Sequence, residues 1–257
     1  MADEILYTIK DGIATVTMNR PEKRNALNTA LLDGMTNIFQ RIETDADVRV
    51  LVIRGAGKAF CSGLDLRELS SRQTGGGDPE SGVIQVFRQI ERSRHPTIAM
   101  VQGDALAGGC ELALHCDLRV ASEGARFGMP LARLGLVVPF PLGQKLVEII
   151  GPAFTKQILL TGQPIDAQRA YEIGMIHQLV STSELEAATY ALARTIADNA
   201  PLSLAGMKAT ILRAISLRET IDYKDLAESV NRARKSTDAQ EGVKAMLEKR
   251  KPVFRGE

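Results

Sequence analysis

The sequence lacks an excess of charge of either sign. Its 257 residues include 32 Lys and Arg against 31 Asp and Glu, which gives a formal net charge of +1. Proteins that attract nucleic acid or anionic membranes electrostatically usually carry a basic surplus. We therefore expect neither nucleic acid nor a membrane as the main partner of this chain.

Long apolar runs and cysteine are also scarce. No stretch approaches the ~20 apolar residues of a membrane-spanning helix. The first ten residues, MADEILYTIK, lack the basic region, apolar stretch and cleavage site of a secretory signal. The three cysteines, Cys61, Cys110 and Cys116, form no CxxC pattern. An odd number of cysteines without such a pattern fits a cytoplasmic protein with reduced thiols best.

What the sequence does contain is a repeated alternation of short strands, glycine turns and helices. Asp11-Gly12 separates two strand-like runs and predicts a β-hairpin. Six apolar positions between Leu31 and Ile42 follow the period of a helix. Further buried strands are expected at 48–54, 97–101, 118–121 and 175–180. This alternation predicts an α/β fold with crossover connections.

The last part of the chain is mainly helical in pattern. Three helices are expected after residue 180, with breaks near Pro201 and at 216–220, and Asp238 with Glu241 resembles a capping box. We expect a core at 1–195 that carries the site and a helical region at 196–257. The segment 70–82, SSRQTGGGDPESG, has almost no apolar residue and is expected to be a mobile loop.

Two glycine turns are the strongest candidates for chemistry. In AGGCELALHCD (107–117), paired glycines stand between a strand and a helix and allow close backbone approach to a ligand. Free N–H groups at the helix start can bind a negatively charged oxygen. Glu111 lies in the first helical turn, where an acid can also have a purely structural role. A second turn, CSGLD (61–65), could supply another N–H donor to the same oxygen.

Together, several motifs resemble the crotonase superfamily, also called the enoyl-CoA hydratase/isomerase family. The similarity runs from about Ile5 to Phe254. The motifs are NRPEKRNAL (19–27), KAFCSGLD (58–65), GGCEL (108–112) with CD (116–117), FGMP (127–130), LTG (160–162) and EKRK (248–251). The resemblance implies a spiral of repeated β-β-α turns, a C-terminal helical oligomerisation region and assembly into homotrimers or homohexamers.

Site residues follow from the resemblance, position by position. The oxyanion-hole amides fall on Leu64 and Gly108, and the catalytic acid falls on Glu111. The substrate, an acyl-CoA thioester, would contact Lys23, Arg24, Ser62, Asp65, Arg67, Leu131, Val138 and Phe140. Coenzyme A is part of the substrate, so no separate cofactor is expected. No metal site is expected either, because the polar residues near Glu111 lack a closed ligand spacing.

Leu131 departs from the family pattern. Hydratases of this family place a second glutamate directly after the FGMP motif, where the two acids orient one water. Leucine can neither accept nor donate a proton. This departure leaves ordinary two-glutamate hydration open to question, although a single acid can still shuttle a proton.

The expected function is an acyl-CoA-processing lyase, an enoyl-CoA hydratase for an unusual or cyclic enoyl or dienoyl ester. The alternatives are a double-bond isomerase, a thioesterase or a decarboxylase of the same fold, and a CoA-binding protein without catalysis. A serine peptidase is disfavoured because Ser62 has no evident histidine partner.

Overall fold

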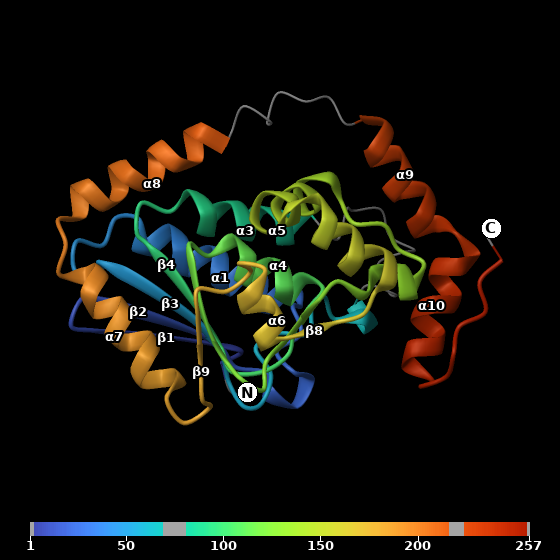
Figure 1. The fold of residues 1–257 in the computed structure, drawn as a ribbon, viewed down its shortest axis with the longest axis horizontal. Coiled ribbons are helices and arrows are strands. Elements are labelled where there is room, and N and C mark those ends of the chain that lie inside the picture. Colours follow the sequence, from blue (N-terminus) through green and yellow to red (C-terminus); the bar gives the residue numbers. More distant parts are fainter. Residues whose placement is uncertain (1–2, 69–80, 216–223, 256–257) are drawn as a thin grey trace.

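A six-stranded sheet forms the centre of the computed structural model, which describes residues 3–68, 81–215 and 224–255 (Figure 1). The strand order is β1-β2-β3-β4-β6-β9, and every pairing from β2 onward is parallel. The strands are β1 (Ile5–Lys10), β2 (Ile13–Met18), β3 (Val50–Gly55), β4 (Thr97–Val101), β6 (Leu118–Ser122) and β9 (Gln178–Val180). The α/β expectation is confirmed, although the last strand is shorter than predicted.

The predicted hairpin is present at the edge of this sheet. Strands β1 and β2 are antiparallel, with Lys10 paired to Ile13. Asp11 and Gly12 both have positive φ angles, of 51° and 76°. Positive φ at both central residues defines the two-residue turn whose twist matches the flanking strands.

The sheet is buried on both faces, which explains the nearly continuous apolar runs of its strands. In β3, Leu51 and Ile53 face the main core with helix α1 (Thr29–Ile42), while Val50 and Val52 face α7 (Leu185–Ala197). Successive side chains point to opposite faces of a strand, so a single apolar run supplies both cores.

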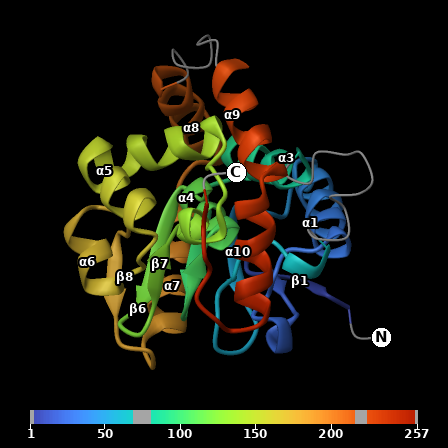
Figure 2. The same ribbon diagram turned by 90° about the vertical axis from the view of Figure 1, so that its right-hand side faces the viewer.

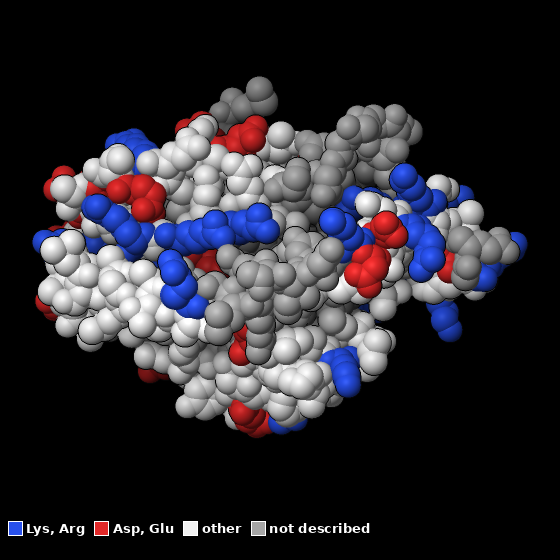
Figure 3. Space-filling view, turned by 90° about the horizontal axis from the view of Figure 1, so that it is seen from above, with Lys and Arg blue, Asp and Glu red and all other residues white. Residues whose placement is uncertain are grey.

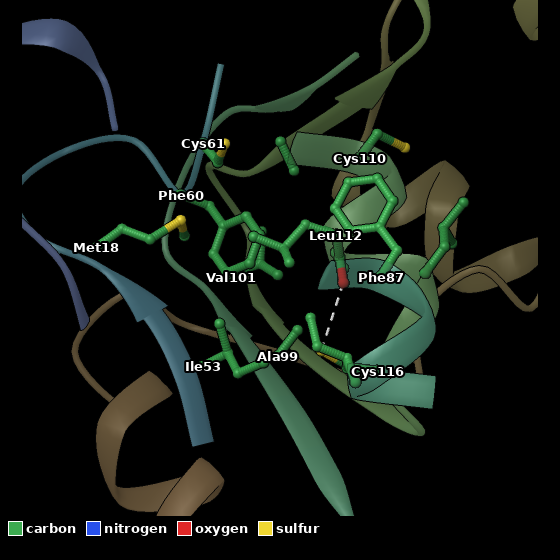
Figure 4. Close-up of a cluster of buried hydrophobic side chains, with 14 of the residues drawn as sticks. Met18, Ile53, Phe60, Cys61, Phe87, Ala99, Val101, Cys110, Leu112 and Cys116 are labelled. Carbon is green, nitrogen blue, oxygen red and sulfur yellow. Dashed lines mark hydrogen bonds between the residues drawn. The ribbon is translucent and has the colours of Figure 1, made fainter. Parts of the chain in front are cut away.

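A second, three-stranded sheet lies next to the glycine turns. It consists of β5 (Ala105–Leu106), β7 (Arg126–Gly128) and β8 (Ile165–Asp166). Cys61 forms an isolated bridge with Ala105. This pairing brings the turn at 61–65 alongside the chain that leads into helix α4 (Gly108–His115). The inner face of α4 is apolar and packs against the sheet and Phe87, as Figure 4 shows for Leu112 and Cys116.

The remaining helices cover and flank this core. They are α3 (Ser81–Arg92), α5 (Phe140–Thr161), α6 (Ala167–Glu172), α8 (Pro201–Ile215), α9 (Lys224–Lys235) and α10 (Thr237–Leu247), with a 3-10 helix, η2, at Pro130–Leu134. Helix α8 runs along the top of the molecule in Figure 1, and α10 lies at the opposite end from α7. None of the described helices is long and apolar enough to cross a bilayer.

The C-terminal helices differ from the sequence expectation. Two helices, α9 and α10, occupy the stretch where one was predicted, and Ser236 divides them. The cap of α10 is the Ser236 side chain, which accepts a hydrogen bond from Ala239 N–H, so the predicted Asp238–Glu241 capping box is wrong. Asp238 lies in the first turn and accepts from Arg255 N–H instead. Most of the proposed loop at 70–82 lies outside the described residues.

Candidate active site

The two glycine turns predicted to act together meet in the structure. A Cβ atom added to Gly63 would lie 3.0 Å from the backbone nitrogen of Gly108. A Cβ added to Gly108 would lie 3.8 Å from the nitrogen of Leu64 and 3.5 Å from the Cα of Gly63. The backbone amides of Leu64 and Gly108 therefore border the same small space. This is the arrangement needed for two donors to one carbonyl oxygen.

The backbone geometry leaves both amides available. Leu27 pairs with the 61–65 turn by donating to Gly63 O, at 2.8 Å, and accepting from Asp65 N–H, at 2.9 Å. In such a parallel bridge the intervening residue, Leu64, directs its own N–H to the other side. Gly108 is the first residue of α4, whose N-terminus has no side-chain cap. Its N–H has no intrahelical acceptor.

Ala107 gives this turn an uncommon backbone conformation. Its φ and ψ angles are 49° and −123°, a combination that costs a non-glycine residue of the order of 1–3 kcal/mol. The strand pairing holds it in place, because Ala107 N–H donates to Gly128 O at 2.8 Å. Strain of this kind concentrates at functional turns, and here it sets the direction of the amide that follows.

The two adjacent glycines should respond differently to substitution. A Cβ at Gly109 would lie 2.0 Å from Cys61 O, whereas a Cβ at Gly108 meets only contacts of 3.4 Å or more. Gly109→Ala should therefore lower the melting temperature by several degrees. Gly108→Val should fold but lose activity, since its side chain crowds the space beside Leu64 N–H. Circular dichroism melts and turnover check both, and an active Gly108→Val enzyme would place the hole elsewhere.

Glu111 lies one helical turn after Gly108 and is wholly buried, with 0% of its surface exposed. Neither carboxyl oxygen has a hydrogen-bond partner among the described residues. Burial raises the pKa of Glu111 well above its ordinary value, and the nearby Lys145 ammonium opposes only part of that rise. Burial therefore favours the protonated form of this carboxyl, which has no hydrogen-bond partner among the described residues.

A pH-dependent stability follows from this burial. An unfolded glutamate ionises near pH ~4.3, while the folded one keeps its proton to higher pH. Within that window the native state binds more protons than the unfolded state, so its stability falls as the pH rises. The Glu111→Gln variant has no ionisable group at this position, so it does not lose stability in this way as the pH rises. The melting temperatures of variant and wild type should be similar near pH 4 and diverge toward pH 7, with the variant higher. A difference that is constant with pH would contradict the assignment.

A cavity of about 360 Å³ opens in front of the two amides. Leu64 and Gly108 form part of its wall, together with the predicted contacts Lys23, Arg24, Ser62, Asp65, Arg67 and Leu131. Most of its remaining lining is apolar. Glu111 is not part of the cavity surface and lies behind it, one turn along α4.

The C-terminal helix closes one side of this cavity, which sequence reasoning missed. Met246 and Leu247 at the end of α10 belong to its lining. The backbone of α10 packs directly on η2, because a Cβ at Gly242 would lie 2.5 Å from Leu134 O. Figure 2 shows α10 running down this face of the molecule. The sequence feature that could have indicated this packing is Gly242, a glycine inside a helical pattern, at a position where the structure leaves no room for a side chain.

The polar residues around the cavity mouth are held by ion pairs. Asp104 accepts from Arg24 and, at 2.8 Å, from both Nε and Nη2 of Arg126. Asp65 accepts from the buried Arg20 at 3.2 Å and from the N–H of Arg67. Asp104 therefore positions the exposed guanidinium of Arg24. Asp65 fixes the backbone next to Leu64.

Two predicted contacts lie elsewhere. Val138 packs against the main core and is not among the residues that line this cavity. Phe140 begins α5 and lines two neighbouring cavities. Pro139, between these two residues, does line the cavity, and α5 starts directly after it. Leu134, Leu136 and Leu142 supply the apolar wall instead.

Comparison with known proteins identifies the family of this chain. The family model of enoyl-CoA hydratase/isomerase matches residues 8–257. A short-chain-enoyl-CoA hydratase of Clostridium acetobutylicum is 36% identical over 246 residues, which cover 94% of each chain. A 2,3-dehydroadipyl-CoA hydratase of Escherichia coli is 31% identical and covers 98% of this chain and 99% of its own.

Solved structures show the same fold. A methylmalonyl-CoA decarboxylase in complex with 2-nitronate-propionyl-CoA superimposes with a TM-score of 0.90 at 30% identity, covering 99% of each chain. A carnitinyl-CoA hydratase from Mycobacterium avium gives 0.87 at 33% identity over the whole of both chains. The chain therefore belongs to the enoyl-CoA hydratase/isomerase family and is an enzyme of that family, with the crotonase fold.

Proposed function

We propose that this enzyme is an acyl-CoA lyase that forms a thioester enolate and protonates its α-carbon from Glu111. The observation that carries the proposal is the buried Glu111 carboxyl, whose pKa is raised by burial and which lies one helical turn from the paired amides of Leu64 and Gly108. The two N–H groups hold the thioester oxygen as negative charge develops on it. Glu111, whose pKa is raised by burial, then acts as the general acid in this proposal.

The leading reaction is hydration of an unusual enoyl-CoA, such as a cyclic or dienoyl ester. The oxygen of water bonds to the β-carbon, and the electrons of the double bond move into the enolate. Glu111 gives its proton to the α-carbon and takes the proton that water releases. One carboxyl thus serves both transfers, which suits a site with leucine at position 131.

Decarboxylation of a malonyl-type CoA ester is the second candidate. The similarity to methylmalonyl-CoA decarboxylase, and a cavity wall in which Leu131 replaces an acid, favour it. The bond to the carboxylate breaks, carbon dioxide leaves, and the electron pair forms the same enolate. Glu111 protonates the α-carbon and is left ionised, so a proton from solvent must restore it.

A screen of CoA esters with mass detection separates these reactions. Crotonyl-CoA, a cyclic dienoyl-CoA and methylmalonyl-CoA are incubated with the enzyme. Hydration adds the mass of one water, decarboxylation removes that of carbon dioxide, and isomerisation changes no mass. Products of free CoA alone would indicate a thioesterase and contradict the lyase proposal. Since a carboxyl and two amides are sufficient, we propose no cofactor, and EDTA should leave the rate unchanged.

We further propose that the enzyme assembles as a trimer or a pair of trimers through its C-terminal helical region, residues 196–257. On α8, Leu202, Met207 and Ile211 are 88%, 63% and 63% exposed, although they are apolar. If other subunits packed on this patch, its apolar side chains would be removed from water. Light scattering should give a trimer or hexamer for the wild type, and a smaller species for Met207→Glu with Ile211→Glu. A wild-type monomer would contradict this assembly.

We also propose a cytoplasmic location. Cys61, Cys110 and Cys116 are free and buried. Burial raises the pKa of the Cys61 and Cys116 thiols to about 12, which keeps them protonated and unreactive. Free thiols of this kind suit a reducing compartment.

A further inference from the structure

A second cavity lies on the other side of the acid. It measures about 490 Å³ and is enclosed by α3, α4, α5 and α8. It shares Ile84 and Leu142 with the cavity in front of the amides, so these two side chains separate the two spaces. Its other walls include Glu91, His115, Lys145 and Glu148.

Three charged side chains form a cluster in this cavity. Lys145 Nζ contacts a carboxylate oxygen of Glu91 and lies 3.3 Å from Oε2 of Glu148. Their side chains are only 11%, 22% and 12% exposed. A largely buried ion cluster gives little net stability, because desolvation offsets the attraction. A polar space of this size also readily holds several waters.

His115 connects this cavity to Glu111. Its Nδ1 lies 2.8 Å from Glu111 O and 3.8 Å from Glu111 Oε2. A carbonyl oxygen only accepts, so Nδ1 carries the hydrogen, and burial lowers the pKa of His115 to about 4, which keeps the ring neutral. The ring stacks on Phe87 with centroids 4.9 Å apart. The Glu111 carboxyl therefore lies beside a fixed, neutral ring that lines the polar cavity.

We propose that Glu111 exchanges its proton with solvent through this polar cavity, and that Lys145, held by Glu91 and Glu148, is the positioning residue for that exchange. The inference rests on the proposed function, in which Glu111 is the acid. When a CoA ester fills the cavity in front of the amides, its acyl group and the apolar wall keep water from that side. The polar cavity then gives the remaining access to the buried carboxyl.

The charges around Glu111 come from each element packed on α4. Helix α3 supplies Glu91, helix α5 supplies Lys145 and Glu148, and strand β6 supplies the buried Arg119, which donates to carbonyl oxygens at the end of α4. Helix α8 supplies Arg213 to the lining of the cavity, and the molecule seen from above in Figure 3 carries other Lys and Arg side chains on its surface. Of these groups, the Lys145 ammonium lowers the pKa of Glu111 and so opposes part of the rise caused by burial.

The test follows the exchange of α-protons of propionyl-CoA in D₂O, which needs no knowledge of the natural substrate. Ionised Glu111 removes an α-proton, the enolate forms at the two amides, the Glu111 proton exchanges for a deuteron, and the deuteron returns to carbon. Mass spectrometry measures the label. Because only ionised Glu111 removes a proton, the rate should rise with pH.

Loss of the Lys145 cation should make ionisation of Glu111 harder and leave the carboxylates of Glu91 and Glu148 without their shared cation. Lys145→Met should move the rising part of the pH profile to higher pH and slow exchange about tenfold at pH 7. Lys145→Arg should retain the wild-type profile. Glu91→Gln removes an opposite charge from the same cluster, so it should not move the profile to higher pH. A purely structural role would not produce this dependence on the sign of the charge.

The exchange experiment separates a failure of the proposed function from a failure of this inference. If Glu111→Gln exchanges α-protons as fast as wild type, Glu111 is not the acid and the proposed function itself is wrong. If Glu111→Gln is inactive, but a folded Lys145→Met shows the wild-type rate and pH profile, this inference alone is overturned. Should Lys145→Met fail to fold, Lys145→Gln, which removes the same cation but keeps a polar side chain in the cavity, should show the same slow, upward-shifted profile. A wild-type profile in a folded Lys145→Gln overturns the inference equally.

Discussion

Glu111→Gln should reduce turnover by about two or more orders of magnitude, the range typical of losing a general acid. The amide has the size of the neutral acid but cannot transfer a proton. The hole at Leu64 and Gly108 is untouched, so binding of the CoA ester should survive. Steady-state kinetics on any ester that the enzyme turns over, together with calorimetric binding, would measure both quantities.

A matched control separates this effect from a general loss of charge. Glu123 is an exposed acid just beyond β6, and Glu123→Gln should leave turnover unchanged. Near-native rates for Glu111→Gln would remove Glu111 from the mechanism. Loss of binding in step with turnover would assign it to substrate binding instead.

Leu131→Glu should raise hydration of crotonyl-CoA by about two decades over wild type. Two carboxylates hold a water through charge-assisted hydrogen bonds, and each oriented contact to a reacting group contributes a few kcal/mol. Leu131 is half-buried in the wall of the cavity that Leu64 and Gly108 border. A carboxylate there would reach the same space as a bound acyl group.

Leu131→Gln is the control for this gain, since it adds polarity and length without an ionisable proton. It should show no comparable increase. The argument from the missing glutamate is wrong if wild type already hydrates crotonyl-CoA at on the order of hundreds per second. In that case another group supplies the second oriented contact.

Much of the fold could be predicted from local patterns. Strands such as β3 and β4 are short apolar runs between turn signals, and the hairpin at Asp11-Gly12 requires only two residues to specify its turn. That the amides of Leu64 and Gly108 border one space could be predicted because both belong to glycine turns, which leave a mark in the sequence. Glu111 could be proposed as the acid for the same reason, since it lies one turn after Gly108.

The remaining parts depend on tertiary contacts that no local pattern encodes. Met246 and Leu247 reach the cavity because α10 packs on η2 through Gly242, which meets Leu134 more than 100 residues earlier in the chain. From the sequence, a second acid to act with Glu111 was expected at position 131, which is Leu131 in this chain. The charged groups that line the second cavity with His115 come from α3 and α5, and Glu91 and Lys145 are ordinary surface-like residues in the sequence.

The position of deuterium in the product tests the central claim most directly. Wild-type enzyme is run in D₂O on a CoA ester that it turns over, and fragmentation locates the label. The account predicts one deuterium on the α-carbon, introduced by Glu111, and none above the solution background with Glu111→Gln under the same conditions. An unlabelled α-carbon in the wild-type product, or equal labelling by Glu111→Gln, would contradict it.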